Sequence, residues 1–473
     1  MAANFLHGVE TIEIEKGPRP IRTVKSAVVG LIGTAPIGDV NTPTIVLSDR
    51  QAAQFGPQLT GFSIAQALDA IFDQGAGTVI VINVLNPATH KTAVPSETVL
   101  LKGDVGKTAK PAWAGAAVVK NDAGTVTHAL GTDYTTDPVT GEIRRKVGGA
   151  IAADASLKVT YDYLDPTKVT PADIIGTVNG AGQRTGMQAL LDTYNLMGFF
   201  AKLLIAPGYS TLNSVASELI VMAHKLRAEA ILDAPIGTTY AQAIAGRGPA
   251  GVINFNTSSE RAILCYPHLK VYDAPTDSER LEPYSQRLAG VMCAKDNDKG
   301  YWWSPSNTEI KGIVGVERQL SAMINDPQSE VNLLNEVGIV TLFNSFGTGI
   351  RTWGNRSAAW PSVTHPKNFI NVRRTADILH ESVEYAMLQF IDQPINNALI
   401  DAIKESVNAF VRTLISRGAL IDGNCSYDPT KNPPTEIALG HLTFDLEFMP
   451  PTPAERISFE SFINIELLKQ LGQ

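Results

Sequence analysis

The sequence predicts an α/β protein. A mostly parallel, doubly wound sheet carries an inserted small β domain and is followed by an α+β domain. Strand-like and helix-like segments alternate over residues 27–84 and again over 186–266, which is typical of strands joined by crossover helices. That alternation stops over residues 94–180, which are rich in Gly, Thr, Val and Asp. Both chain ends carry a short strand pattern without a nearby partner.

The bulk composition indicates a soluble globular protein of several domains. The chain has 473 residues, 44% apolar and 18% charged, which favours two to four domains. A net charge of −8 argues against a nucleic-acid-binding face. We expect no signal peptide and no membrane insertion, because the N-terminus has no apolar core segment and every apolar run is short. The three scattered cysteines predict neither a disulfide framework nor a metal site.

Residues 1–25 are predicted to form an N-terminal arm. Ile12 and Ile14 alternate with glutamates, which predicts a short strand with one apolar face. The Gly-Pro and Pro residues at 17–20 then exclude a helix. An isolated strand leaves its backbone groups unpaired, so this one needs a sheet edge elsewhere.

The α/β domain is predicted to be discontinuous, formed by residues 26–93 and 181–345. In its first part the expected elements are strands at 27–32 and 78–84 and a helix at 63–72. In its second part they are strands at 199–206, 230–233 and 262–266, with helices at 211–227, 238–245 and 283–295. The inserted β-rich domain, residues 94–180, has strand patterns and a hairpin turn at 137–141.

A C-terminal α+β domain is predicted over residues 346–455. Helices are expected at 377–391 and 396–416, and a strand with period two at 442–448. Residues 456–473 form a second arm, whose strand pattern rests on alternating apolar residues. These are Ile457, Phe459, Ile463 and Ile465.

The stretch 338–377 connects the two large domains and is strongly basic. No acid occurs between Glu336 and Asp377, while five Lys or Arg residues do. Apolar runs at 339–343 and 369–372 predict two strands. The arginines are Arg351, Arg356, Arg373 and Arg374. They indicate either a contact surface or a binding site, and Trp353 is expected to pack in the core.

Motifs for catalysis are weak throughout. Residues 246–251 match GxGxxG, but they follow a helix and contain Pro249, which removes a donor that a phosphate site needs. The eight histidines show no metal-ligand spacing. Asp233 ends a predicted parallel strand, a common site position, but we expect it to cap the turn at Gly237 and Thr238. We therefore predict no enzyme and no cofactor; an α/β hydrolase or nucleotide-using enzyme is the alternative.

Charge and the two arms together favour self-assembly. Residues 420–473 contain eight acids and three basic residues, opposite in sign to the basic stretch. Two terminal strands without partners predict β-augmentation between copies, with charge setting the register.

Several motifs resemble those of the tail sheath proteins of contractile bacteriophage tails and related bacteriocins. They are NSFGTGIRTWGNR at 344–356, FINVRRTAD at 369–377 and GYWWSPSN at 300–307, with the opening FLHGVE at 5–10. The resemblance covers nearly the whole chain except the insertion.

The resemblance implies a structural subunit with a subtilisin-like topology in its α/β part, without catalytic residues. It implies a helical homo-oligomeric array around an inner tail tube protein, with baseplate and tail terminator proteins as further partners. Contraction would drive the tube through the host envelope for genome delivery. The sheath would be part of the virion, assembled in the host bacterial cytoplasm; a bacteriocin or injection-system sheath is an alternative.

The resemblance also implies contact residues. An inner helix would lie against the tube, and Asp377, Glu381 and Glu384 share one helical face, so we expect this face either to meet basic tube residues or to be plainly solvated. The insertion is expected to face outward. The intersubunit contacts are expected at the four arginines and at the arm residues Ile12, Ile14, Ile457, Phe459, Ile463 and Ile465.

Overall fold

The computed structural model describes residues 20–471, apart from residues 76, 274–275 and 346. The predicted arm residues Ile12 and Ile14 lie outside the described residues. Among the described helices, none is long and apolar enough to cross a membrane.

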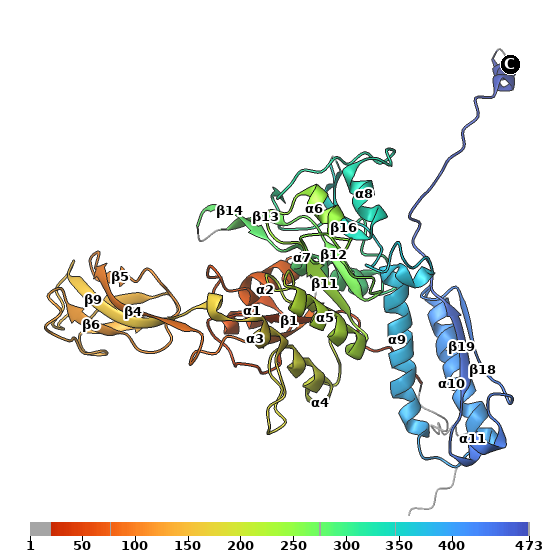
Figure 1. The fold of residues 1–473 in the computed structure, drawn as a ribbon, viewed down its shortest axis with the longest axis horizontal. Coiled ribbons are helices and arrows are strands. Elements are labelled where there is room, and N and C mark those ends of the chain that lie inside the picture. The colour runs from red at the N-terminus through yellow and green to blue at the C-terminus, as the bar shows by residue number, and fades with distance from the viewer. Residues whose placement is uncertain (1–19, 76, 274–275, 346, 472–473) are drawn as a thin grey trace, which may run out of the picture.

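A mostly parallel, eight-stranded sheet forms the centre of the molecule, as predicted (Figure 1). Its strand order is β17-β16-β12-β11-β10-β1-β3-β2. The six inner strands run parallel: β1 (Val28–Gly33), β3 (Thr78–Asn83), β10 (Leu203–Ile205), β11 (Glu229–Asp233), β12 (Ala262–Cys265) and β16 (Ile339–Ser345). The two edge strands, β2 (Thr44–Val46) and β17 (Gly349–Trp353), are antiparallel to their neighbours.

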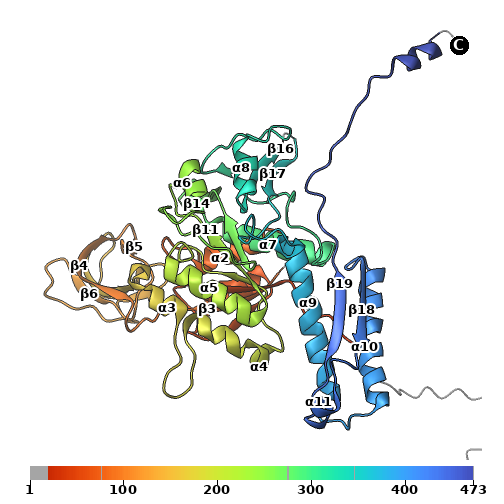
Figure 2. The same ribbon diagram turned by 45° about the vertical axis from the view of Figure 1, so that its right-hand side comes forward.

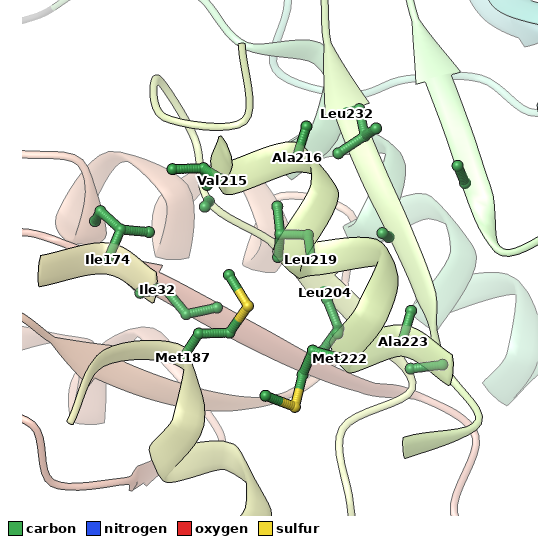
Figure 3. Close-up of a cluster of buried hydrophobic side chains, with 14 of the residues drawn as sticks. Ile32, Ile174, Met187, Leu204, Val215, Ala216, Leu219, Met222, Ala223 and Leu232 are labelled. Atoms are coloured by element: carbon green, nitrogen blue, oxygen red, sulfur yellow. The ribbon is translucent and has the colours of Figure 1, made fainter. Parts of the chain in front are cut away.

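Helices cover both faces of this sheet, because neighbouring residues of each buried strand point to opposite sides. Val28 and Ile32 of β1 belong to one apolar core, and Val29 and Leu31 to the other. Helix α5 (Asn213–Leu226) packs on the first face, where its apolar side chains meet Leu204 and Met187 (Figure 3). Helices α2 (Ile64–Phe72) and α7 (Tyr284–Asp298) cover the second.

Shorter elements complete the α/β domain. The helices are α1 (Asp49–Ala52), α3 (Pro171–Ile175), α4 (Thr193–Met197), α6 (Tyr240–Ala245) and α8 (Glu330–Glu336). A small sheet contains β13 (Leu269–Asp273), β14 (Ser278–Glu282) and β15 (Gly315–Val316). A seven-residue 3₁₀ helix, η3 (Gly186–Asp192), precedes α4.

The predicted β insertion projects from the main body as a separate unit (Figure 1). Its strands are β4 (Lys91–Leu100), β5 (Val105–Lys107), β6 (Val118–Asn121), β7 (Tyr134–Asp137), β8 (Glu142–Arg145) and β9 (Ser156–Leu164). Strands β7 and β8 form the predicted hairpin. The expected limit at residue 180 is too late, because Val169 and Ile174 pack in the main sheet's core.

Two antiparallel helices and a two-stranded sheet form the C-terminal part (Figure 2). The elements are α9 (Ile370–Met387), α10 (Asn397–Ser416), β18 (Asp422–Tyr427), α11 (Pro434–Ala438) and β19 (Phe444–Met449). The predicted strand at 369–372 is wrong: α9 already begins at Ile370. A run as short as Phe-Ile-Asn-Val fits a buried helix as well as a strand, and here Ile370 is buried in the sheet's core.

Beyond Met449 the chain leaves the molecule as an extended arm (Figure 1). Residues 450–464 contain no helix or strand, and η6 (Ile465–Gln470) lies near the tip. The predicted arm strand is extended only up to Asn464, without a strand partner in the described part of this single chain; from Ile465 the prediction is wrong, because η6 takes its place.

Candidate assembly interface

The C-terminal arm exposes a row of large apolar side chains. Phe459 and Ile463 are each 90% exposed. The remaining members of the row are Ile457, Phe462, Ile465, Leu467, Leu468 and Leu471, all more than half exposed. Exposed apolar surface of this extent marks an interaction site. Sequence reasoning identified the alternating members but missed Phe462 and the three leucines.

The sheet β18–β19 offers a matching surface. Its strands pair only with each other among the described strands, so both outer edges are open. Helix α10 supports the sheet through Asn408, whose side chain donates to Cys425 O at 2.9 Å and accepts from Cys425 N at 2.7 Å. A two-stranded sheet is marginal by itself, and open edges are templates for further strands.

The N-terminal arm leaves from the same part of the molecule. Val24 N donates to Ser382 Oγ of α9 at 3.1 Å. Ile21 packs against the core between α9, α10 and the small sheet. The root of the first arm is therefore fixed on the C-terminal domain.

The acidic face of α9 is turned inward, so its predicted contact with a tube is wrong for Asp377 and Glu381. Both residues are buried. Arg261 Nη2 donates to Asp377 Oδ1 at 2.7 Å, and Lys202 donates to Glu381. Helical spacing shows that the acids share a face but not what covers it. Here the cover is the edge of the sheet where the parallel strands begin.

Glu384 ends this acidic face and is more exposed. It pairs with Arg227, and 57% of its side chain remains accessible. Arg227 precedes β11 at the same edge of the sheet as Lys202 and Arg261. The whole face therefore docks α9 onto the α/β domain.

Arg373 and Arg374 also act within their own chain. Arg374 is buried and forms a two-pronged contact with Asp296, with Nη1 and Oδ1 2.8 Å apart. Arg373 reaches Glu260 at 3.2 Å and Asp377 at 2.9 Å. The prediction that Arg374 grips a neighbouring subunit is wrong, because its guanidinium is enclosed. The partners of Arg373 likewise belong to its own chain.

Glu229 lies at the centre of these ion pairs without a partner of its own. It is almost completely buried, and neither of its carboxyl oxygens has a hydrogen bond within the described residues. Desolvation raises the pKa of Glu229 to about 8, although Arg261 acts in the opposite direction. Burial therefore favours the protonated form of Glu229 at neutral pH.

Arg356 binds the C-terminal arm of its own chain, whereas the sequence predicted contact with a neighbouring subunit. Its Nε donates to Glu455 Oε1 at 2.8 Å, and its Nη1 to Asn368 Oδ1 at 2.8 Å. The guanidinium lies 3.8 Å from the ring of Trp360 and 4.3 Å from that of Phe369. Sequence reasoning did not identify Glu455.

Arg351 lines an open cleft of about 660 Å³. Its Nη1 donates to Asn307 O at 3.1 Å. Lys295, Lys311 and the half-exposed Trp303 line the same cleft. Within the described residues these three cations form no ion pair with an acid. Lys299, Asp298 and Glu309 also line the cleft, so its lining contains four cations and two acids.

The residues considered for catalysis have structural roles. Asp233 accepts from Ser285 N at 2.8 Å and from Ser285 Oγ at 2.5 Å, so it caps the start of α7 rather than the turn at Gly237. Arg247, inside the GxGxxG match, donates to five backbone carbonyls: Val337, Phe255, Thr257, Ala358 and Trp360. No group of His, Cys, Asp or Glu in the described ranges is arranged to hold a metal.

Comparison with known proteins identifies the family. The model of the phage tail sheath protein central domain matches residues 182–358, and that of the phage tail sheath C-terminal domain matches residues 362–464. The tail sheath protein of Burkholderia phage BcepMu is 60% identical over 474 residues, covering 100% of this chain and 99% of that protein. The chain belongs to the phage tail sheath family.

More distant tail sheath proteins extend the match. The tail sheath protein of Escherichia phage P2 is 24% identical, and the match covers 99% of this chain and 98% of the P2 protein. The contracted sheath complex of PVC, an extracellular contractile injection system, shares the fold with a TM-score of 0.62 at 14% identity. It covers 99% of this chain and 100% of that one. The contracted helical sheath of the anti-feeding prophage has a TM-score of 0.60 at 15% identity. The match covers 98% of this chain and 100% of that one.

This sheath protein is therefore a structural subunit of a contractile sheath and not an enzyme. The tail sheath is a component of the phage particle. The alternative of a hydrolase or nucleotide-using enzyme is excluded.

Proposed function

We propose that this sheath protein polymerises helically around an inner tail tube and contracts to drive the tube through the host cell envelope for genome delivery. One observation carries the proposal: the same chain exposes an apolar arm and an open-edged two-stranded sheet. An arm that leaves one copy and pairs with another is a heterologous contact. Such a contact builds a helical polymer when it does not close into a ring.

The open edges of β18 and β19 would accept arms from neighbouring copies by β-augmentation. Ile457, Phe459, Ile463 and Ile465 have the same parity along the arm, so a paired arm strand would direct them to one face of the enlarged sheet. Ile12 and Ile14 share one parity in the N-terminal arm. We propose that both arms add strands to the same kind of sheet.

The contact with the tube would come from α10 instead of α9. Asp401, Glu405 and Arg412 lie on its exposed side, and more than 60% of each side chain is accessible. Exposed charge pairs contribute only about 0–1 kcal/mol each. Weak contacts of this kind suit a surface that must release the tube during contraction.

The remaining assignments follow from this arrangement. Baseplate and tail terminator proteins would meet the two ends of the array, and assembly would take place in the host bacterial cytoplasm. The β insertion would face outward, because mass on the inside would obstruct the tube. We further propose a subtilisin-like topology for the central sheet and the division into the domains that the sequence predicts, with the insertion ending near residue 164.

The basic cleft at Arg351 would receive an acidic segment of a neighbouring subunit. Lys295 supports this proposal, because burial and the nearby Arg351 lower its pKa. An incoming carboxylate would relieve that repulsion. Sheaths of phage tails and of injection systems share this fold, and the 60% identity to a phage protein favours the phage tail.

Removal of residues 456–473 tests the proposal. The truncated chain keeps β18–β19 and every described core, so we expect a soluble monomer that forms no sheaths. Electron microscopy and sedimentation of truncated and full-length protein provide the measurement. Tubular polymers of ordinary length from the truncated chain would falsify assembly by this arm.

A further inference from the structure

The root of the C-terminal arm is fixed at two points where the chain leaves β19. Asn371 Nδ2 of α9 donates to Pro451 O at 3.0 Å and to Trp302 O at 2.9 Å. Four residues further on, Glu455 binds Arg356 through both carboxylate oxygens. Past Glu455, residues 456–464 form no hydrogen bond or ion pair with the body of the molecule within the part of the chain described.

The Arg356 side of this contact is rigid. The guanidinium lies between the rings of Trp360 and Phe369, and Asn368 accepts its third hydrogen bond. Asn368 is itself buried and donates to Val363 O at 2.8 Å. A planar guanidinium held in this way binds a carboxylate in one orientation. Glu455 therefore fixes the direction in which the arm leaves.

This direction of the arm prevents a simpler structure, in which the arm would pair with the sheet of its own chain. Consecutive strands usually pair with each other. Only seven residues, 450–456, separate β19 from the apolar arm segment at Ile457. A linker of this length is long enough for the arm to turn back and pair with the open edge of its own β19. An arm paired in this way would close the site that a neighbouring arm needs.

We propose that Arg356 and Glu455 form a clamp that holds the arm away from its own sheet and thereby enforces exchange between subunits. Arg356 is the positioning residue of this exchange, and the three prolines at 450, 451 and 453 stiffen the linker that it holds. The clamp also moves the start of the free arm to residue 456. This inference rests on the proposed arm exchange and adds to it the control of self-pairing.

Glu455→Gln in the full-length chain is the test, with Glu460→Gln as matched control. Both variants remove one arm carboxylate, but Glu460 has no ion pair within the described residues. Spin labels at Ser461→Cys and Ser426→Cys report the distance from arm to sheet in the unassembled protein. The native cysteines are buried. We expect a short-distance population in E455Q about tenfold larger than in wild type and E460Q, with a matching drop in sheath yield.

Two outcomes separate the inference from the proposed function. If E455Q has the arm distances and sheath yield of wild type while removal of residues 456–473 abolishes sheaths, the clamp is wrong and arm exchange stands. If sheaths form without residues 456–473, arm exchange itself fails. Arg356→Lys provides a second variant, because lysine keeps the charge but loses the two-pronged geometry. It should resemble E455Q.

Discussion

At the residue scale, the junction between the two large domains is dominated by buried charge. Lys202, Arg261 and Arg374 each meet a carboxylate of their own. The carboxyl group of Glu229 has no hydrogen-bond partner within the described residues, so burial dominates its pKa. The sequence shows Glu229 only as the residue before an apolar strand, so its environment could not be predicted without the position of α9.

Glu229 makes the stability of the unassembled protein depend on pH. Its pKa is about 8 in the folded chain against an ordinary 4.5, so between these values the folded chain binds one more proton than the unfolded chain. Stability should therefore fall with rising pH over this window, by up to about 1.4 kcal/mol per pH unit. Glu229→Gln keeps the shape of the protonated acid and should lose this slope. Urea unfolding at pH 5.5 and 8 measures the difference; parallel profiles for the two proteins would show that Glu229 is ionised.

At the element scale, α9 shows how far the sequence could be interpreted. The spacing of Asp377, Glu381 and Glu384 correctly placed three acids on one helical face. It gave no information on whether that face meets solvent, a partner or the chain itself. Tertiary contact decides this, because Lys202 and Arg261 directly precede strands β10 and β12, more than a hundred residues earlier in the chain. Strand β18 was missed for a related reason: Asp422–Tyr427 is polar, and its pairing with β19 defines it as a strand.

The buried pair Lys202–Glu381 supports a prediction about α9. Lys202→Met would leave Glu381 buried without its cation, which typically costs about 3–5 kcal/mol. Adding Glu381→Leu removes the unpaired charge, and the double variant should regain most of the loss. Chemical unfolding of the wild type, the two single variants and the double variant measures the coupling. Additive losses would mean that the pair does not hold α9 to the sheet.

At the scale of the whole molecule, the sequence predicted the parts better than their contacts. The alternation of strands and helices gave the parallel sheet, and the period-two apolar residues gave the arm. Both signals are local and repeat over many residues. The basic stretch at 351–374 gave a wrong partner for Arg374 because charge alone does not distinguish an interface from a buried ion pair. What makes this chain a sheath subunit is the combination of an anchored body and an arm without a partner.

Charge reversal on α10 would distinguish contact with the tube from contact between subunits. Reversal of two acids on α10, in Asp401→Lys/Glu405→Lys, changes the proposed tube surface but leaves the arms, β18–β19 and the Arg356 clamp unchanged. We expect polymers that still form but have empty lumens and irregular lengths when tube protein is present. Glu384→Lys is the matched control, since Glu384 is similarly exposed but faces Arg227 of its own chain. Electron microscopy of both variants with tube protein measures the filled fraction. If Glu384→Lys empties the lumens and the α10 variant does not, the tube lies against the end of α9.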